Sequence, residues 1–122
     1  MQNLVNFIDI PAVDFHRAVA FYQTILDLPI HATEVFGSPM GFFPSDGKNA
    51  SGAIVQGADY KPSTEGVLVY LNGGNDLQTA LSKVEPNGGK ILVPKTFISE
   101  EVGYIAIFID TEGNKMALHS MN

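Results

Sequence analysis

The sequence has 122 residues and contains neither cysteine nor tryptophan. The lack of cysteine excludes a disulfide scaffold, a thiolate zinc site, an iron–sulfur cluster and a cysteine nucleophile. Basic residues are also scarce, since 7 Lys and Arg stand against 13 Asp and Glu and give a formal net charge of -6. The field of such a chain repels phosphate backbones, so we expect no nucleic-acid partner.

Long apolar runs are missing as well. None approaches the roughly 20 residues that span a bilayer, so we expect no membrane partner. The first residues lack a basic region followed by an apolar block, which predicts a cytoplasmic protein. Charged residues make up only 16%, against about a quarter in average soluble domains. We therefore expect part of the surface to be covered by a second copy, in a homodimer that also covers free sheet edges.

The first half of the chain shows a strand, a helix and three further strands. Residues 4–10 are typical of a strand, which Pro11 ends. Asp14 is a candidate N-cap, and the apolar residues behind it recur at helical spacing, which predicts a helix from about 14 to 27. Short apolar stretches separated by turn residues predict strands near 30–36, 40–44 and 51–56.

The same order recurs after a polar connection. A strand is followed by a helix that ends at Pro86-Asn-Gly-Gly89, and then by three strands, the first of them closed by Pro94. The predicted elements are a strand at 66–71, a helical face at 77–84, strands at 91–93 and 104–110, a hairpin turn at 111–114 and a strand at 115–120. The chain 1–122 is thus predicted to be a single α+β domain with one half at about 1–57 and the other at about 66–122. A small ligand is expected in the cleft between the halves.

Two segments resemble a known family: Ile10-Pro-Ala-Val-Asp-Phe-His-Arg-Ala-Val-Ala-Phe-Tyr22 and Gly103-Tyr-Ile-Ala-Ile-Phe-Ile-Asp-Thr-Glu-Gly-Asn-Lys-Met-Ala-Leu-His119. Together with residues 68–77 and 88–95, they are similar to the vicinal oxygen chelate (VOC) superfamily, which includes glyoxalase I, bleomycin- and fosfomycin-resistance proteins and extradiol dioxygenases. The nearest likeness is to small glyoxalase-like proteins related to lactoylglutathione lyase. The resemblance implies tandem βαβββ repeats, the glyoxalase/bleomycin resistance/dihydroxybiphenyl dioxygenase fold.

The metal-dependent members of that superfamily bind one divalent ion through side chains from four strands. The resemblance carries these positions onto Phe7, onto or beside Gln56, onto Val67 or Val69, and onto Ala117. Three of the four are hydrocarbon, whereas a divalent metal needs three or four protein donors. The resemblance therefore implies neither a metal nor another cofactor. Members without the metal, such as the bleomycin-binding proteins, use the cleft to sequester a ligand.

Strand alternation extends this candidate site. Asp9 shares a face with Phe7, and His119 shares one with Ala117. A carboxylate and an imidazole can act as a general base or a proton donor, so Asp9 and His119 are the candidate catalytic groups if the protein is an enzyme. The expected ligand-binding residues are Phe7, Asp9, Gln56, Val67, Val69, Ala117 and His119.

Three functions stay open at this point. The first is binding of a small, partly apolar molecule without a tightly held metal. The second is a lyase or isomerase of the glyoxalase-like group, either metal-dependent or acting by acid–base chemistry. The third is an interaction subunit with a vestigial cleft. The sequence also leaves open whether the two halves of one chain form the cleft together, or whether each half forms a cleft with a half of a second chain.

Overall fold

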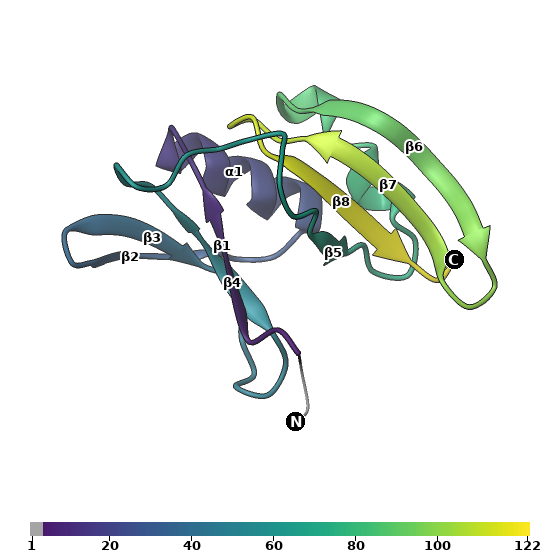
Figure 1. Ribbon diagram of the computed structural model, residues 1–122, viewed down its shortest axis with the longest axis horizontal. Helices are drawn as coiled ribbons and strands as arrows, with labels where there is room; N and C mark the ends of the chain where they lie inside the picture. Colours follow the sequence, from purple (N-terminus) through teal and green to yellow (C-terminus); the bar gives the residue numbers. More distant parts are fainter. Residues whose placement is uncertain (1–3) are drawn as a thin grey trace.

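The computed structural model describes residues 4–122 and contains two four-stranded sheets, one from each half of the chain (Figure 1). The elements of the first half are β1 (Phe7–Pro11), α1 (Phe15–Leu26), β2 (His31–Val35), β3 (Ser38–Phe42) and β4 (Ser51–Val55). Those of the second half are β5 (Tyr70–Asn72), α2 (Gln78–Leu81), the 3-10 helix η1 (Glu85–Asn87), β6 (Lys90–Ser99), β7 (Gly103–Ile109) and β8 (Lys115–Ser120).

The two sheets repeat one topology. Sheet 1 has the strand order β1-β4-β3-β2, and sheet 2 has the corresponding order β5-β8-β7-β6. Strand β1 pairs with β4 in parallel, and β5 pairs with β8 in the same way. The remaining neighbours in each sheet are antiparallel. This arrangement confirms the predicted α+β fold of tandem βαβββ repeats.

Helix α1 follows the sequence pattern closely. The Asp14 carboxylate caps it by accepting a hydrogen bond from the backbone amide of Arg17, at 3.2 Å. The apolar stripe is buried, with Phe21 and Tyr22 among the fully enclosed side chains. The helix ends where Asp27 adopts a left-handed conformation.

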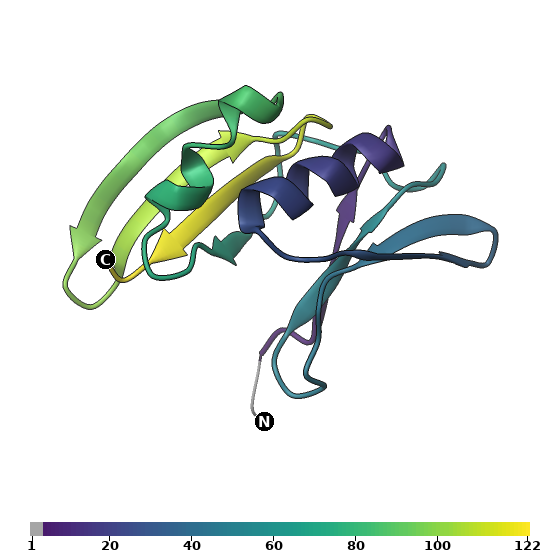
Figure 2. The same cartoon turned by 180° about the vertical axis from the view of Figure 1, so that it is seen from behind.

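Both helices lie on the same side of the sheets, as the views from the front and from behind show (Figures 1 and 2). Side chains from both halves meet there in one core; Ile10 and Ile54 come from sheet 1, and Phe108 and Leu118 from sheet 2. The ring of Phe21 on α1 lies 6.1 Å from that of Phe108, so the helix of one half packs on the sheet of the other. In the described chain no helix covers the opposite faces, which we call the open faces.

Three elements of the second half differ from the sequence prediction. Strand β6 does not end at Pro94 but continues to Ser99, and its register with β7 shifts on either side of the proline. Proline is tolerated there because β6 is an edge strand, whose outer side needs no donor. The expected strand at 66–71 is reduced to β5, and the second helix to the single turn of α2 followed by η1, because Pro86 and the left-handed Gly88 end it.

None of the helices within residues 4–122 has the length and apolar character needed to cross a membrane.

Candidate functional site

The open face of sheet 1 carries an exposed aromatic pair. The register of β1, β4 and β3 aligns Asp9 with Ala53 and Ala53 with Phe42, so the odd-numbered residues of β1 lie on this face. The ring of Phe7 is 47% exposed, and its centroid lies 6.1 Å from that of Phe42. The exposed part of this face therefore carries an aromatic pair and the carboxylate of Asp9, while Ala53 at its centre is buried.

The open face of sheet 2 is built in the same way around β5 and β8. Tyr70 pairs with Ala117, and Asn72 pairs with His119. Ala117 is completely buried, whereas Tyr70 is half exposed beside it. The imidazole Nε2 of His119 contacts the carbonyl oxygen of Val102 in the loop that joins β6 to β7.

A cavity of about 180 Å³ separates the edge of β1 from the segment that leads into β5. Its lining includes three of the predicted ligand-binding residues, Asp9, Val67 and Val69. The basic side chains of Lys61 and Lys115 also line it. The cavity thus combines an apolar wall with charges of both signs.

Gln56 lies on the other side of sheet 1 from Phe7. Its Oε1 accepts a hydrogen bond of 2.7 Å from the backbone amide of Phe15, at the start of α1. It lines an open hollow of about 860 Å³ there. A shift of one residue along a strand turns a side chain to the opposite face, and it is Val55 that shares the open face with Ala53 by register.

The predicted ligand-binding residues therefore occupy four places in one chain. Phe7 lies on the open face of sheet 1, and Ala117 and His119 lie on that of sheet 2. Asp9, Val67 and Val69 line the 180 Å³ cavity, and Gln56 is at the first turn of α1. Their role in ligand binding stays a prediction.

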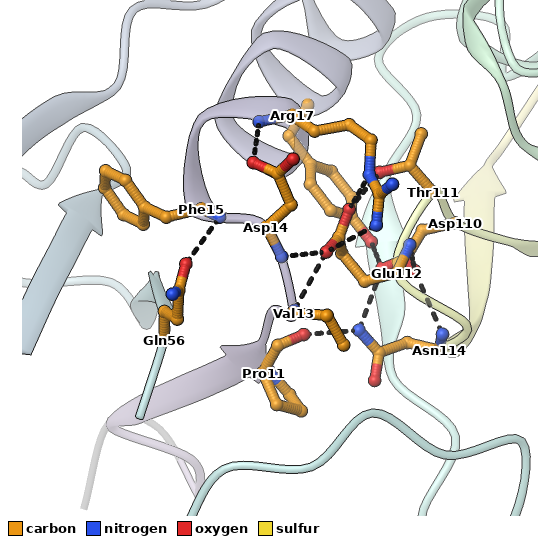
Figure 3. A network of polar contacts seen from close by, with 11 residues as sticks. Pro11, Val13, Asp14, Phe15, Arg17, Gln56, Asp110, Thr111, Glu112 and Asn114 are labelled. Carbon is orange, nitrogen blue, oxygen red and sulfur yellow. Dashed lines mark hydrogen bonds and ion pairs between the residues drawn. The ribbon is translucent and has the colours of Figure 1, made fainter. Parts of the chain in front are cut away.

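The structure also brings together a polar cluster at the start of α1 that the sequence analysis treated only as a hairpin turn (Figure 3). Glu112, in the turn between β7 and β8, accepts hydrogen bonds from the backbone amides of Val13 at 2.8 Å and Asp14 at 2.6 Å. It also forms an ion pair with Arg17, whose Nε lies 2.7 Å from Glu112 Oε2. The Glu112 side chain is fully buried, whereas that of Arg17 is 50% exposed.

Two more residues of the same turn extend the cluster. The hydroxyl of Tyr22 donates to Asp110 Oδ2 at 2.6 Å, and Asn114 Nδ2 donates to the Pro11 carbonyl at 2.7 Å. Asp110 is almost fully buried. We call Arg17, Tyr22, Asp110, Glu112 and Asn114 the inter-half clasp, because it joins α1 and β1 of the first half to the β7–β8 turn of the second.

The ionisation of the clasp follows from its contacts. Burial acts to raise the pKa of Glu112, but hydrogen bonds from Arg17, the Asp14 amide and Thr111, together with the Arg17 charge, leave the pKa below its usual value. Burial and the Asp110 charge raise the pKa of Tyr22 well above its usual value. Glu112 is therefore an anion at the positive end of α1, and Tyr22 is a neutral donor. Because these hydrogen bonds and the ion pair join the first half to the second, the clasp stabilises the fold.

Arg17 and Glu112 are separated by 95 positions in the sequence. An acidic residue in a hairpin turn was the only signal of the clasp, and such a residue is commonly solvated. Sequence spacing cannot reveal a contact of this length.

The donors present do not fit a divalent metal at the positions that the family resemblance indicates. Phe7 and Ala117 offer no donor atom, nor do Val67 and Val69, and Gln56 is bound to the backbone of α1. Within residues 4–122, no group of three or more His, Cys, Asp or Glu side chains is placed to hold a metal ion.

Comparison with known proteins agrees with this geometry. The family model described as Glyoxalase/Bleomycin resistance protein/Dioxygenase superfamily matches residues 4–118. A glyoxylase-like domain-containing protein from Didymella fabae is 29% identical over 128 residues, which cover 97% of this chain and 94% of that protein.

Solved structures share the fold at low identity. A glyoxalase/bleomycin resistance protein from Albidiferax ferrireducens has a TM-score of 0.74 at 17% identity, covering 95% of this chain and 97% of that one. The fosfomycin resistance protein FosX from Listeria monocytogenes has a TM-score of 0.68 at 16% identity, with 98% and 91% covered. A glyoxalase I mutant from Zea mays has a TM-score of 0.70 at 17% identity, and the match covers 95% of this chain but only 45% of the maize chain.

The two sheets, their repeated topology and the match over residues 4–118 lead to one conclusion. The chain belongs to the Glyoxalase/Bleomycin resistance protein/Dioxygenase superfamily.

Proposed function

We propose that the protein binds a small, partly apolar molecule on its open sheet faces, without a tightly held metal. The observation that carries this proposal is the side chain at position 7. Where metal-dependent relatives place a ligand to the ion, this chain has the half-exposed ring of Phe7 beside Phe42. Two such rings on an uncovered face favour a flat or aromatic molecule, because stacking adds to the burial of apolar surface.

Polar groups near these rings are few, which limits the chemistry of the ligand. Asp9 follows Phe7 on the same face of β1, and Lys61 and Lys115 line the adjoining cavity. On the second sheet, Tyr70 and His119 are the polar side chains next to Ala117. A molecule with one or two polar groups fits this surface better than a sugar or a phosphate.

We also propose that the protein acts as a homodimer. The open faces carry large exposed side chains, and only 16% of the residues are charged. A second copy would cover exposed apolar side chains and a free sheet edge.

A thermal-shift screen of small planar aromatic compounds tests the binding proposal, because a ligand of the native state raises its melting temperature. We expect a subset of compounds to raise Tm equally with and without added Zn²⁺, Ni²⁺ or Mn²⁺. The shift should be lost in Phe7→Ala and kept in Leu92→Ala, which removes a comparably exposed apolar side chain from β6. A shift that requires a metal ion would contradict the proposal and favour the lyase or isomerase.

A further inference from the structure

We infer that the free edge of β2 is a docking surface for a second copy of this chain, with the two β2 strands pairing antiparallel about Thr33. This inference rests on the homodimer proposed above and names its interface. It is independent of the identity of the ligand and of the rings on the open faces.

The two sheets have four edge strands, and three of them are protected against pairing. In β1, Pro11 has no amide hydrogen, and its carbonyl accepts a hydrogen bond of 2.7 Å from Asn114. Strand β5 is only three residues long. Strand β6 contains Pro94 and shifts register several times along β7. Short strands, prolines and bulges are the devices with which natural sheets block their edges.

Strand β2 has neither a proline nor a bulge, and Glu34 is its one carboxylate. It runs from His31 to Val35 without proline, glycine or lysine, and it pairs with β3 in one unbroken register. Its first four residues are exposed and the last is half-buried. Figures 1 and 2 place it at the outer edge of sheet 1, away from sheet 2, and its residues Ala32 to Glu34 share an open hollow with the start of α1. An edge of this kind is a template for another strand.

The turn beside β2 fixes which backbone groups point outward. Phe36 and Gly37 both have positive φ, +50° and +79°, as the two-residue type I′ hairpin requires. Such a turn makes Val35 and Ser38 a hydrogen-bonded pair, and such pairs alternate along an antiparallel ladder. The amides and carbonyls of Ala32 and Glu34 therefore point away from β3.

The residue opposite Glu34 supports this assignment. It is Pro39, which has no amide hydrogen to offer, and its carbonyl accepts from the Gln56 amide on the β4 side, at 3.4 Å. Glu34 thus finds no backbone partner in β3.

The outward groups of β2 are self-complementary. Ala32 and Glu34 flank Thr33 symmetrically, so a twofold axis at Thr33 sets each Ala32 opposite the partner subunit's Glu34. Both amides and both carbonyls of each strand then form hydrogen bonds with the other copy, and Thr33 faces its own equivalent. A twofold interface needs a surface that matches itself in this way, and cross-strand threonine pairs are favourable.

Phe36 provides a second, independent observation. Its side chain is fully exposed, at 103%, and its backbone is left-handed, which is rare for a bulky residue. Asparagine would satisfy the same turn without an exposed ring. In the proposed register, Phe36 lies at the end of the paired strands, where the second copy would cover part of its exposed ring. Strained residues persist where the surroundings or a function require them.

Amide hydrogen exchange measured at several protein concentrations tests the pairing directly. We expect the Ala32 and Glu34 amides to exchange without protection in dilute protein and to become protected as the dimer forms. The Thr33 and Val35 amides, which face β3, serve as internal controls with protection at every concentration. A dimer that forms without protecting Ala32 and Glu34 would overturn the inference while leaving the homodimer in place. A particle of 13.1 kDa at all concentrations would overturn both.

Two variants sharpen the test by sedimentation velocity. Phe36→Asn should raise the dimer dissociation constant about tenfold or more, as for an interface hot spot. It should also raise the Tm of the dilute monomer, because asparagine prefers this turn. Glu34→Pro removes an outward donor and should give a monomer with an intact ladder to β3. Leu92→Asn on β6 is the matched control and should dimerise as the wild type does. Unchanged association of Phe36→Asn would contradict the inference even if Glu34→Pro does not fold.

Discussion

Replacement of Glu112 by alanine is the change most informative about how the two halves are joined. Glu112 is completely buried and accepts hydrogen bonds from two backbone amides of the first half, Val13 and Asp14. It also pairs with Arg17 and accepts from the Thr111 hydroxyl. Glu112→Ala leaves both amides at the start of α1 without this acceptor and leaves the guanidinium without its anion.

The expected loss follows from the burial of the two partners. Removing one member of a buried pair costs about 3–5 kcal/mol, but Arg17 is half exposed and regains water, so we expect about 2–4 kcal/mol. At roughly 4 °C per kcal/mol for a domain of this size, the Tm should fall by about 8–16 °C. Glu112→Gln keeps an acceptor for the amides but loses the charge, and should cost about 1–2 kcal/mol.

Urea unfolding followed by circular dichroism measures these losses, with Glu101→Ala as the control. Glu101 is an exposed acidic residue in the β6–β7 loop, so its replacement should change the free energy of unfolding by less than about 0.5 kcal/mol. Hydrogen exchange in Glu112→Ala should also rise at Val13 and Asp14. If Glu112→Ala unfolds at the same urea concentration as Glu101→Ala, the clasp does not stabilise the contact between the halves, and the reasoning is refuted.

Three further changes test other contacts. Tyr22→Phe should cost about 1–3 kcal/mol in urea unfolding, because the nearly buried Asp110 loses a donor at 2.6 Å; an unchanged midpoint would contradict the hydrogen bond. Gln56→Leu should lower the free energy of unfolding by about 1 kcal/mol, because the amide of Phe15 at the start of α1 loses its acceptor; a stability equal to the wild type would contradict this capping role. Acid should weaken the clasp: the pKa of Glu112 is lowered on folding, so its stabilisation is present above the unfolded value of about 4.3 and is lost as the pH falls through the folded value. The stability difference between wild type and Glu112→Gln should therefore shrink below about pH 4, and a difference that stays constant down to pH 2 would contradict the assignment.

Periodicity and capping predicted much of the fold. Helix α1 ends within a residue of its predicted limits, since the apolar stripe from Phe15 and the Asp14 cap are local signals. Strand β8 coincides with the prediction because the turn at 111–114 begins it. Strand β6 was underestimated, because a proline ends a central strand but is harmless at an edge, and edge position depends on the whole sheet.

The candidate site was harder to predict than the fold. Phe7 and Ala117 lie on open faces, as strand alternation indicates, but Gln56 is one position from the residue that shares this face. A register error of one residue reverses the side of the sheet. The Glu112–Arg17 contact joins residues 95 positions apart, and neither residue alone signals its partner.

The central claim, a binding site without a tightly held metal, is tested most directly by elemental analysis of the protein after dialysis against equimolar Zn²⁺, Ni²⁺, Mn²⁺ and Fe²⁺. Phe7, Ala117 and the valines at 67 and 69 supply no donor atoms, and a single imidazole or amide does not retain a divalent ion against water. We therefore expect far less than one metal ion per chain. A content of about one zinc, nickel, manganese or iron ion per chain would contradict the account and would restore a metal-dependent lyase or isomerase as the function.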